Sequence, residues 1–266
     1  MSGVAIFGVT GRMGQSLVRA LAAQQDADPL VLSGALASPA SAALGADAAQ
    51  SGPATGIRVT ADPRRALEGA AVAVDFSRGG LEEHIAACLE RRIPLLIGTT
   101  GLEAATLRAI EGAAAHIALI HAANTSLAVA VLARLAACAD RLLGAGFDVE
   151  ILETHHRGKR DAPSGTALAL GEALAAARGA RLADLAVFDR GAQPGARRAG
   201  SIGFASLRSG DVVGEHTVLF GGEGERLELT HRASDRGVFA RGALAAARWL
   251  VGRTAGRYTM ADVLGL

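Results

Sequence analysis

The first half of the chain alternates short, near-continuous apolar runs with Ala-rich amphipathic runs. Apolar strands without polar alternation are typical of a parallel sheet, because helices bury both faces of such a sheet. The pattern therefore predicts an α/β fold that begins with a Rossmann-type parallel-sheet domain. The predicted strands are 4–7, 30–36, 72–76, 94–97 and 117–120, and the predicted helices are 12–23, 81–91 and 103–115.

The second half has a different pattern, in which Gly-rich turns separate strand-like segments. This order predicts an antiparallel or mixed sheet in a second, α+β domain. Residues 37–56, rich in Ala, Ser and Gly, are predicted to form a loop. The predicted elements are helices 126–143 and 164–177, strands 148–154, 200–208, 215–220 and 226–231, and a final amphipathic helix over 239–251.

Composition excludes several classes of protein. Lys and Arg number 27 against 26 Asp and Glu, whereas a nucleic-acid-binding protein carries a basic excess. No uncharged apolar stretch is long enough for a membrane span, and no signal peptide is recognised, so no membrane association is expected. Cys88 and Cys138 lie in apolar helical patterns and are predicted to be buried, reduced thiols of a cytoplasmic protein.

A glycine turn joins the first predicted strand to the first predicted helix. Gly8, Gly11 and Gly14 can bring backbone N–H groups close to a pyrophosphate at the start of that helix. The spacing G-x-x-G-x-x-G differs from the usual dinucleotide fingerprint, and such a turn also occurs in α/β proteins without a nucleotide. Its place after the first strand favours nucleotide binding.

Other residues near the predicted sheet edge bear on the choice of nucleotide. The second strand ends without the acidic residue that usually holds the ribose 2′-hydroxyl, and Arg12 lies inside the glycine turn. Arg12 could pair with a 2′-phosphate, or it could be a solvated residue at a helix start. The turns at 98–101 and 122–125 follow two strands, and could contact a nicotinamide or be ordinary helix caps.

The densest group of polar residues runs from Glu153 to Thr166. A strand is expected to end at His155 and His156, and Ser164 opens a helix whose first N–H groups can bind an anion. Lys159 is the single lysine beside 26 arginines. An ammonium can release a proton near neutral pH and a guanidinium cannot, so Lys159 is a candidate proton donor, although chance could also place it here. The converging cations predict a small carboxylate or phosphate ligand.

No metal site is predicted. Adjacent strand residues point to opposite faces of a sheet, and no cysteine or suitably spaced histidine accompanies His155 and His156. The remaining histidines are expected to be structural or surface residues, and they are His84, His116, His121, His216 and His231.

Together these motifs resemble the dihydrodipicolinate reductase family. The most specific one is the signature E-x-H-H-x-x-K-x-D-A-P-S-G-T-A, which is intact at 153–167. The similarity covers essentially the whole chain. The similar segments are residues 8–14, 75–77, 98–101, 153–167, 214–217 and 225–231.

The resemblance implies that NADPH or NADH reduces 4-hydroxy-tetrahydrodipicolinate, a small cyclic dicarboxylate, to tetrahydrodipicolinate with loss of water, in diaminopimelate and lysine biosynthesis. It implies His155 as proton donor or acceptor and Lys159 as proton donor. It also implies that His156, Gly165 and Thr166 bind the substrate carboxylates. The implied cofactor contacts are Gly8, Val9, Thr10, Gly11, Arg12, Met13, Gly98, Thr99, Thr100, Ala122, Ala123, Asn124 and Thr125.

The resemblance further implies a homotetramer that assembles through the sheet of the second domain. A dinucleotide-binding domain would comprise residues 1–125 and the returning segment 237–266, and a substrate-binding and oligomerisation domain would comprise 126–236. The chain departs from the family at residues 37–38, which lack the usual ribose-binding acid, and at Thr125, which replaces an aromatic residue. The cofactor preference therefore stays open.

Two other functions fit part of the sequence. A semialdehyde dehydrogenase would need a reactive cysteine in a polar loop, whereas both cysteines lie in apolar patterns. A non-catalytic NADP-sensing regulator would explain the glycine turn but would give no role to the cationic loop at 155–166. Turnover of NAD(P)H in the presence of substrate distinguishes the enzyme from the sensor.

Overall fold

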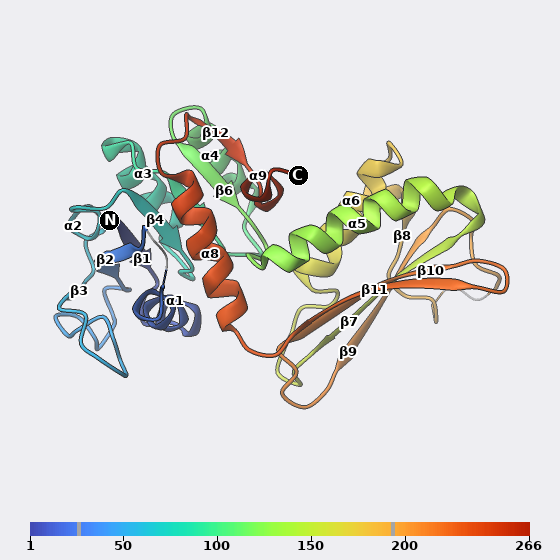
Figure 1. Cartoon of the computed structure of the whole chain (residues 1–266), viewed down its shortest axis with the longest axis horizontal. Helices are drawn as coiled ribbons and strands as arrows, with labels where there is room; N and C mark the ends of the chain where they lie inside the picture. Colours follow the sequence, from blue (N-terminus) through green and yellow to red (C-terminus); the bar gives the residue numbers. More distant parts are fainter. Residues whose placement is uncertain (26–27, 193–194) are drawn as a thin grey trace. The chain divides into compact units, whose positions relative to one another are not determined.

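The computed structural model describes residues 1–25, 28–192 and 195–266 (Figure 1). Its backbone forms two compact units. The first comprises Met1–Ser126 and Arg236–Leu266, and the second comprises Leu127–Asp235. These limits differ by one residue from the predicted domain limits.

A seven-stranded sheet forms the centre of the first unit, and every neighbouring pair of its strands is parallel. The strand order β12-β6-β5-β4-β1-β2-β3 contains the 3-2-1-4-5-6 order of a Rossmann sheet, which confirms the predicted fold class. The strands are β1 (Ser2–Phe7), β2 (Leu30–Leu36), β3 (Val59–Thr60), β4 (Val72–Asp75), β5 (Leu95–Ile97), β6 (Ala118–His121) and β12 (Gly256–Tyr258).

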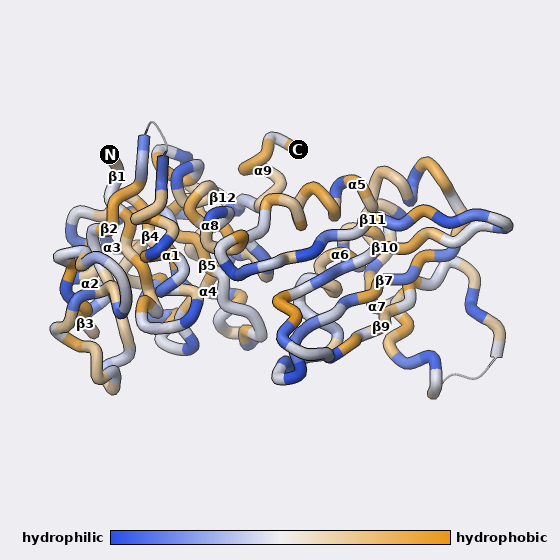
Figure 2. Tube along the Cα trace, turned by 60° about the horizontal axis from the view of Figure 1, so that its bottom comes forward, coloured by the Kyte–Doolittle hydropathy of each residue, from blue (hydrophilic) through white to orange (hydrophobic). Residues whose placement is uncertain are grey.

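Helices bury both faces of this sheet. Ala5 and Phe7 of β1 join the core beneath α3 and α4. Val4 and Ile6 are equally buried and point to the opposite face, where α1 packs beside α8. Two buried faces explain the near-continuous apolar runs, which Figure 2 shows along β1, β2 and β4. The described helices are α1 (Arg12–Ala22), α2 (Pro63–Ala66), α3 (Leu81–Arg91), α4 (Ala104–Ala114), α8 (Gly237–Leu250) and α9 (Met260–Leu264).

The second unit contains a five-stranded mixed sheet in the order β11-β10-β7-β9-β8. Strand β10 is antiparallel to both of its neighbours, whereas β7, β9 and β8 are parallel. Helices α5 and α6 cover one face, and the other face carries no helix in the described residues (Figure 1). The elements are β7 (Asp148–His155), β8 (Ala186–Val187), β9 (Ile202–Arg208), β10 (Gly214–Gly221), β11 (Arg226–Ala233), α5 (Leu127–Leu143), the 3-10 turn η1 (Gly144–Gly146), α6 (Gly165–Ala177) and α7 (Leu182–Leu185).

Two predictions about local structure are wrong. The helix predicted to be final is α8, but β12 and α9 follow it, and β12 adds an edge strand beside β6. Cys138 is half-buried rather than buried.

Cys88 is fully buried. Burial and, to a smaller extent, the charge of Asp75 raise the pKa of its thiol. A thiol with a raised pKa is a poor nucleophile, which argues against thiol catalysis at Cys88.

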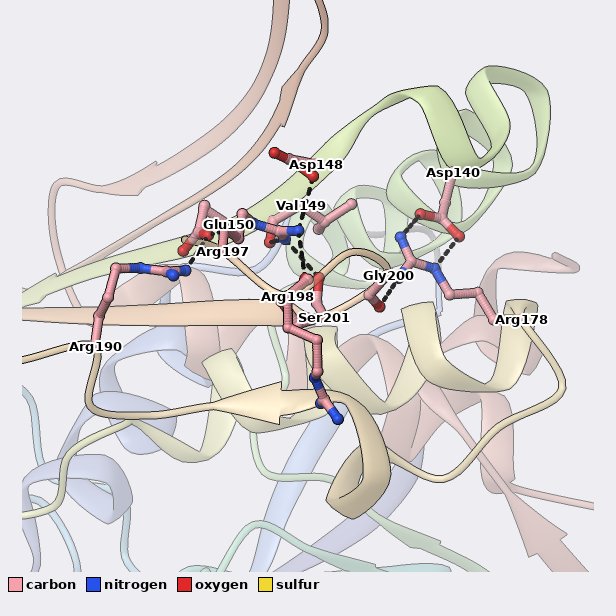
Figure 3. A network of polar contacts seen from close by, with 10 residues as sticks. All are labelled: Asp140, Asp148, Val149, Glu150, Arg178, Arg190, Arg197, Arg198, Gly200 and Ser201. Atoms are coloured by element: carbon pink, nitrogen blue, oxygen red, sulfur yellow. Dashed lines mark hydrogen bonds and ion pairs between the residues drawn. The ribbon is translucent and has the colours of Figure 1, made fainter. Parts of the chain in front are cut away.

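Arginine side chains fix the turn before β9 to neighbouring elements (Figure 3). Arg197 donates to Glu150 on β7. Arg178 forms a two-pronged ion pair with Asp140 on α5 and also donates to the carbonyl oxygen of Gly200. Asp140 is 6% exposed, and within the part of the chain that the structure describes its buried carboxylate is neutralised by the guanidinium of Arg178.

In the described residues, no helix has both the length and the apolar composition needed to cross a membrane.

Candidate active site

His155, the last residue of β7, lies in a buried cluster of charged and polar side chains. Its Nδ1 is 2.5 Å from Oε2 of Glu153, which lies on the same face of β7 because the two residues are two positions apart. Burial lowers the pKa of His155, and the hydrogen bond and charge of Glu153 oppose that effect. A lowered pKa favours the neutral imidazole, and a neutral imidazole that donates Nδ1–H to Glu153 leaves Nε2 available for proton exchange.

Glu153 is held by several donors at once. It is 1% exposed, and Arg208 donates to both of its carboxylate oxygens at 2.8 Å. The backbone N–H of Ser164 donates to Oε1 at 3.2 Å. Burial raises the pKa of Glu153, but hydrogen bonds from Arg208, Ser206 and His155 outweigh burial and hold it at about 2. Glu153 is thus a permanent anion behind His155.

The cationic loop that follows β7 positions Lys159. The backbone N–H of Lys159 donates to the carbonyl oxygen of His156, which closes a tight turn. The Lys159 Nζ lies 2.7 Å from Oδ2 of Asp161. Burial raises the pKa of Asp161, but the hydrogen bond and charge of Lys159 outweigh it and lower that pKa. Arg208, which binds Glu153, also donates to the carbonyl oxygen of Asp161, so one guanidinium links the His155 side of the cluster to the Lys159 loop.

The start of α6 completes this cluster. Ser164 is the N-cap of the helix, and its Oγ accepts from the backbone N–H of Ala167. Gly165 and Thr166 form the first turn, which contains no acidic residue. N–H groups at a helix N-terminus favour a negative charge. The structure therefore brings His155, His156, Lys159, Gly165 and Thr166, all predicted site residues, into one region of the second unit.

His216 belongs to the same cluster, although the sequence predicted a structural or surface role. Strand pairing places it opposite Glu153, and its ring lies edge-on to His155 at 5.2 Å between centroids. Its Nε2 is 3.0 Å from Oγ of Ser164. Burial, reinforced by the charge of His155, lowers the pKa of His216 to about 3. Strand register decides this placement, so no local pattern could have predicted it.

Acid should destabilise the protein partly through His216. Because the folded pKa is about 3 and the ordinary value is 6.5, the unfolded chain binds the extra proton first, and stability falls as pH drops through this range. His216→Gln removes that proton site. Between pH 6 and pH 4 we expect the free energy of unfolding to fall less steeply in the variant than in the wild type. The difference between the two slopes should be about 1.4 kcal/mol per pH unit.

Urea unfolding at several pH values measures this difference. The exposed His116 offers a matched control, since His116→Gln should follow the wild-type slope. Equal slopes for wild type and His216→Gln would mean that His216 does not titrate with unfolding.

A cavity of about 890 Å³ lies against the glycine turn in the first unit. Gly8 has a φ of +77°, and a Cβ there would approach backbone atoms of Phe76 and Ser77 to 2.8–2.9 Å. A Cβ on Gly14 would lie 2.4 Å from the carbonyl oxygen of Gly8. Both glycines are therefore needed for the close approach of strand, turn and helix. The charged or titratable side chains in its described lining are those of Arg12, Arg78, Arg236, Glu83 and His84.

The cavity brings together some of the predicted cofactor contacts. Gly8, Thr10, Gly11, Arg12 and Met13 line it, together with Ala37 and Ser38 at the end of β2. The carbonyl oxygen of Val9 accepts from the Gln15 side chain, and Val9 itself does not line the cavity.

The other predicted cofactor contacts lie at the same edge of the parallel sheet but outside this cavity. Gly98, Thr99 and Thr100 follow β5, and Ala122, Ala123, Asn124 and Thr125 follow β6. The Thr99 hydroxyl donates to the carbonyl oxygen of Ser77, which ties the turn after β5 to the turn after β4. The Thr125 hydroxyl donates to the carbonyl oxygen of Phe239 and so helps to attach α8.

Sequence reasoning missed His84 and Arg236 as cavity residues. His84 Nδ1 lies 2.7 Å from Oδ2 of the fully buried Asp75. Arg236 is distant in sequence from Arg12, yet both line this cavity. Burial, together with the charge of Arg12, lowers the pKa of Arg236.

Among the described residues, no three or more His, Cys, Asp or Glu side chains lie close enough together to hold a metal ion.

Comparison with known proteins identifies the family. A family model described as "Dihydrodipicolinate reductase, N-terminus" matches residues 2–125, and one described as "Dihydrodipicolinate reductase, C-terminus" matches residues 128–264. The chain belongs to the dihydrodipicolinate reductase family. The resemblance found in the sequence motifs is thereby confirmed.

Curated members of this reductase family align over nearly the full chain. The 4-hydroxy-tetrahydrodipicolinate reductase of Thiobacillus denitrificans is 48% identical, and the alignment covers 99% of this chain and 98% of that protein. The enzyme of the same name from Nitrosomonas eutropha is 46% identical over the same shares. The dipicolinate-bound dihydrodipicolinate reductase from Paenisporosarcina sp. TG-14 has a TM-score of 0.72 at 24% identity and 98% coverage of both chains, so it shares the fold.

Proposed function

We propose that His155 and Lys159 carry the proton chemistry of the family's reaction in this chain. Membership of the family makes the chain an NAD(P)H-dependent oxidoreductase that reduces 4-hydroxy-tetrahydrodipicolinate to tetrahydrodipicolinate in diaminopimelate and lysine biosynthesis. The observation that carries the residue assignment is one shared network of contacts. Glu153 binds His155 and the N–H of Ser164 at the start of α6. Arg208 binds Glu153 and the carbonyl oxygen of Asp161 in the loop that carries Lys159. Proton donors and an anion site in one cluster suit reduction of a dicarboxylate.

His156 and the backbone N–H groups of Gly165 and Thr166 would bind the substrate carboxylates, because the start of α6 has no acidic residue to repel them. Lys159 would donate a proton from Nζ, and His155 would exchange one at Nε2. The nicotinamide cofactor, held at the glycine turn, would supply the hydride.

We propose NADPH as a cofactor at least as good as NADH. Ala37 and Ser38 leave the end of β2 without a carboxylate that would repel a 2′-phosphate. Arg12, Arg78 and Arg236 line the nucleotide cavity, which also contains one carboxylate, that of Glu83. An adjoining cavity of about 390 Å³ shares Arg12 and Arg236 and adds Arg19, with no acidic residue in its described lining. This excess of cations favours the more negative cofactor.

Arg12→Gln should lower kcat/KM for NADPH more than for NADH, so that the ratio of the two falls about tenfold. One charge-assisted hydrogen bond to a 2′-phosphate is worth about 1.4 kcal/mol or more, and tenfold corresponds to that value. Steady-state kinetics with both cofactors measures the ratio. A clear NADH preference in the wild type, or an unchanged ratio in Arg12→Gln, would contradict the proposal.

The activity itself is tested by following NADPH oxidation with freshly generated 4-hydroxy-tetrahydrodipicolinate. We expect oxidation that depends on both substrate and enzyme. A protein that binds NADPH without substrate-dependent oxidation would instead be a nucleotide sensor.

The uncovered face of the second sheet supports a homotetramer, which we also propose. Leu152 on β7 and Leu207 on β9 lie on this face and are 37% and 54% exposed. Exposed apolar residues on a helix-free sheet face are typical of an assembly surface. Light scattering should give the mass of four chains, and Leu207→Glu should lower it. A monomeric wild-type protein would rule the tetramer out.

A cytoplasmic location is our remaining proposal. Cys88 and Cys138 are both free, and thiols persist in reducing compartments.

A further inference from the structure

We propose that Glu153 and Arg208 are positioning residues for His155: Arg208 holds the Glu153 carboxylate in place, and Glu153 fixes the His155 tautomer that leaves Nε2 unprotonated for proton exchange. The proposal rests on the proposed role of His155. Neither Glu153 nor Arg208 needs to touch the substrate for this role.

The contacts of Glu153 leave it little freedom. Its Oε2 accepts from Nδ1 of His155 and from Nη1 of Arg208, and its Oε1 accepts from Nη2 of Arg208 and from the N–H of Ser164. A planar guanidinium that meets a carboxylate with two parallel hydrogen bonds fixes the plane of that carboxylate. The carboxylate in turn fixes the orientation of the imidazole, as a hydrogen-bonded acid does for a catalytic histidine in other enzymes.

Strand pairing brings Arg208 to this position. In the parallel pair β7–β9, Arg208 lies opposite His155, and Ser206 lies opposite Glu153. The Arg208 side chain is largely buried beside a fully buried Glu153 side chain. Arg208 also donates to the carbonyl oxygen of Asp161, so it holds the loop that carries Lys159.

Several charged and titratable groups face His155. They are Glu153 on its own strand, Arg208 on β9, Lys159 in the following loop and His216 on β10. Glu153 favours the imidazolium, whereas the positive charges of Lys159 and Arg208 oppose it. Removal of the Arg208 charge should therefore make His155 easier to protonate.

Glu153→Gln tests the tautomer. The amide oxygen is expected at the Oε1 position, where Nη2 of Arg208 and the N–H of Ser164 both donate. In this orientation the amide NH₂ opposes one donor, Nη1 of Arg208, whereas the reverse orientation would oppose two. The amide NH₂ then faces Nδ1 of His155 and makes it an acceptor. The imidazole proton moves to Nε2, the atom that must exchange protons.

We expect Glu153→Gln to lower kcat by about 10²- to 10⁴-fold, with smaller changes in KM and in NADPH binding. Nitrogen NMR of labelled imidazoles should report Nδ1–H in the wild type and Nε2–H in the variant. Glu150→Gln is a matched control, because Glu150 also lies on β7 and also binds an arginine, but points to the opposite face. It should keep the wild-type kcat and His155 tautomer.

Arg208→Gln provides a second test that does not depend on how Glu153→Gln folds. The pH at which kcat/KM falls on the acid side of its pH profile should rise by about one unit, because a positive charge near His155 is lost. A purely structural role would lower activity without moving that pH. The proposal would be overturned by an unchanged His155 tautomer in Glu153→Gln. It would also be overturned if the acid-side fall of kcat/KM in Arg208→Gln did not move to higher pH.

These readouts separate two kinds of failure. If His155→Gln retained full activity, the proposed role of His155 would be wrong. The tautomer measured by NMR would still show whether Glu153 and Arg208 orient the imidazole, because that measurement requires no turnover.

Discussion

Lys159→Arg should lower kcat by about 10²- to 10⁴-fold while the KM for substrate changes much less. A guanidinium can keep both the attraction to a substrate carboxylate and the ion pair with Asp161, which Lys159 makes at 2.7 Å. It cannot release a proton, because its pKa stays above 12. The substitution therefore removes proton donation and retains the charge. Steady-state kinetics over a range of substrate concentrations separates the two parameters.

Two comparisons make the result specific to Lys159. Lys159→Ala should lower kcat and also raise KM, because it removes the charge together with the proton. Arg160→Lys alters the next residue, which is exposed, and should leave both parameters near the wild-type values. Near-normal kcat in Lys159→Arg would make Lys159 an electrostatic contact and leave the proton transfer to His155.

Arg178→Ala should destabilise the second unit by about 3–5 kcal/mol, since it leaves the Asp140 carboxylate buried and without its partner. The Arg178 Nε and Nη2 lie 2.9 Å and 2.6 Å from the two carboxylate oxygens of Asp140 (Figure 3). The same side chain donates to the carbonyl oxygen of Gly200 at 2.7 Å. Loss of the arginine therefore leaves a buried anion, and it removes the hydrogen bond that holds the turn before β9. Urea unfolding followed by circular dichroism gives the change in free energy.

An exposed pair a few residues away serves as the control. Arg181 binds Asp184 with the same two-pronged geometry, but the two side chains are 81% and 52% exposed. Arg181→Ala should cost no more than about 1 kcal/mol, because water already solvates both charges. Equal losses for Arg178→Ala and Arg181→Ala would contradict a special contribution from the buried pair.

The longer helices and strands of the first unit were predictable, because each of them has its own local signal. The strand at Leu30–Leu36 and the helix at Leu81–Arg91 have the predicted limits. Their apolar residues repeat at the strand or helix period, and that repeat is a property of neighbouring residues alone. β12 was not predicted, since its three residues carry no such repeat and pair with β6 from a distant part of the chain.

The sequence by itself determined the family and the residues of the 153–167 signature, because glycines, a lone lysine and a histidine pair at fixed spacing are local facts. Only the tertiary structure decided which side chains surround them. Arg208 reaches His155 through strand pairing, and His216 reaches Glu153 in the same way. Such contacts depend on register between strands that are far apart in sequence, and a shift of one residue would turn each side chain to the opposite face.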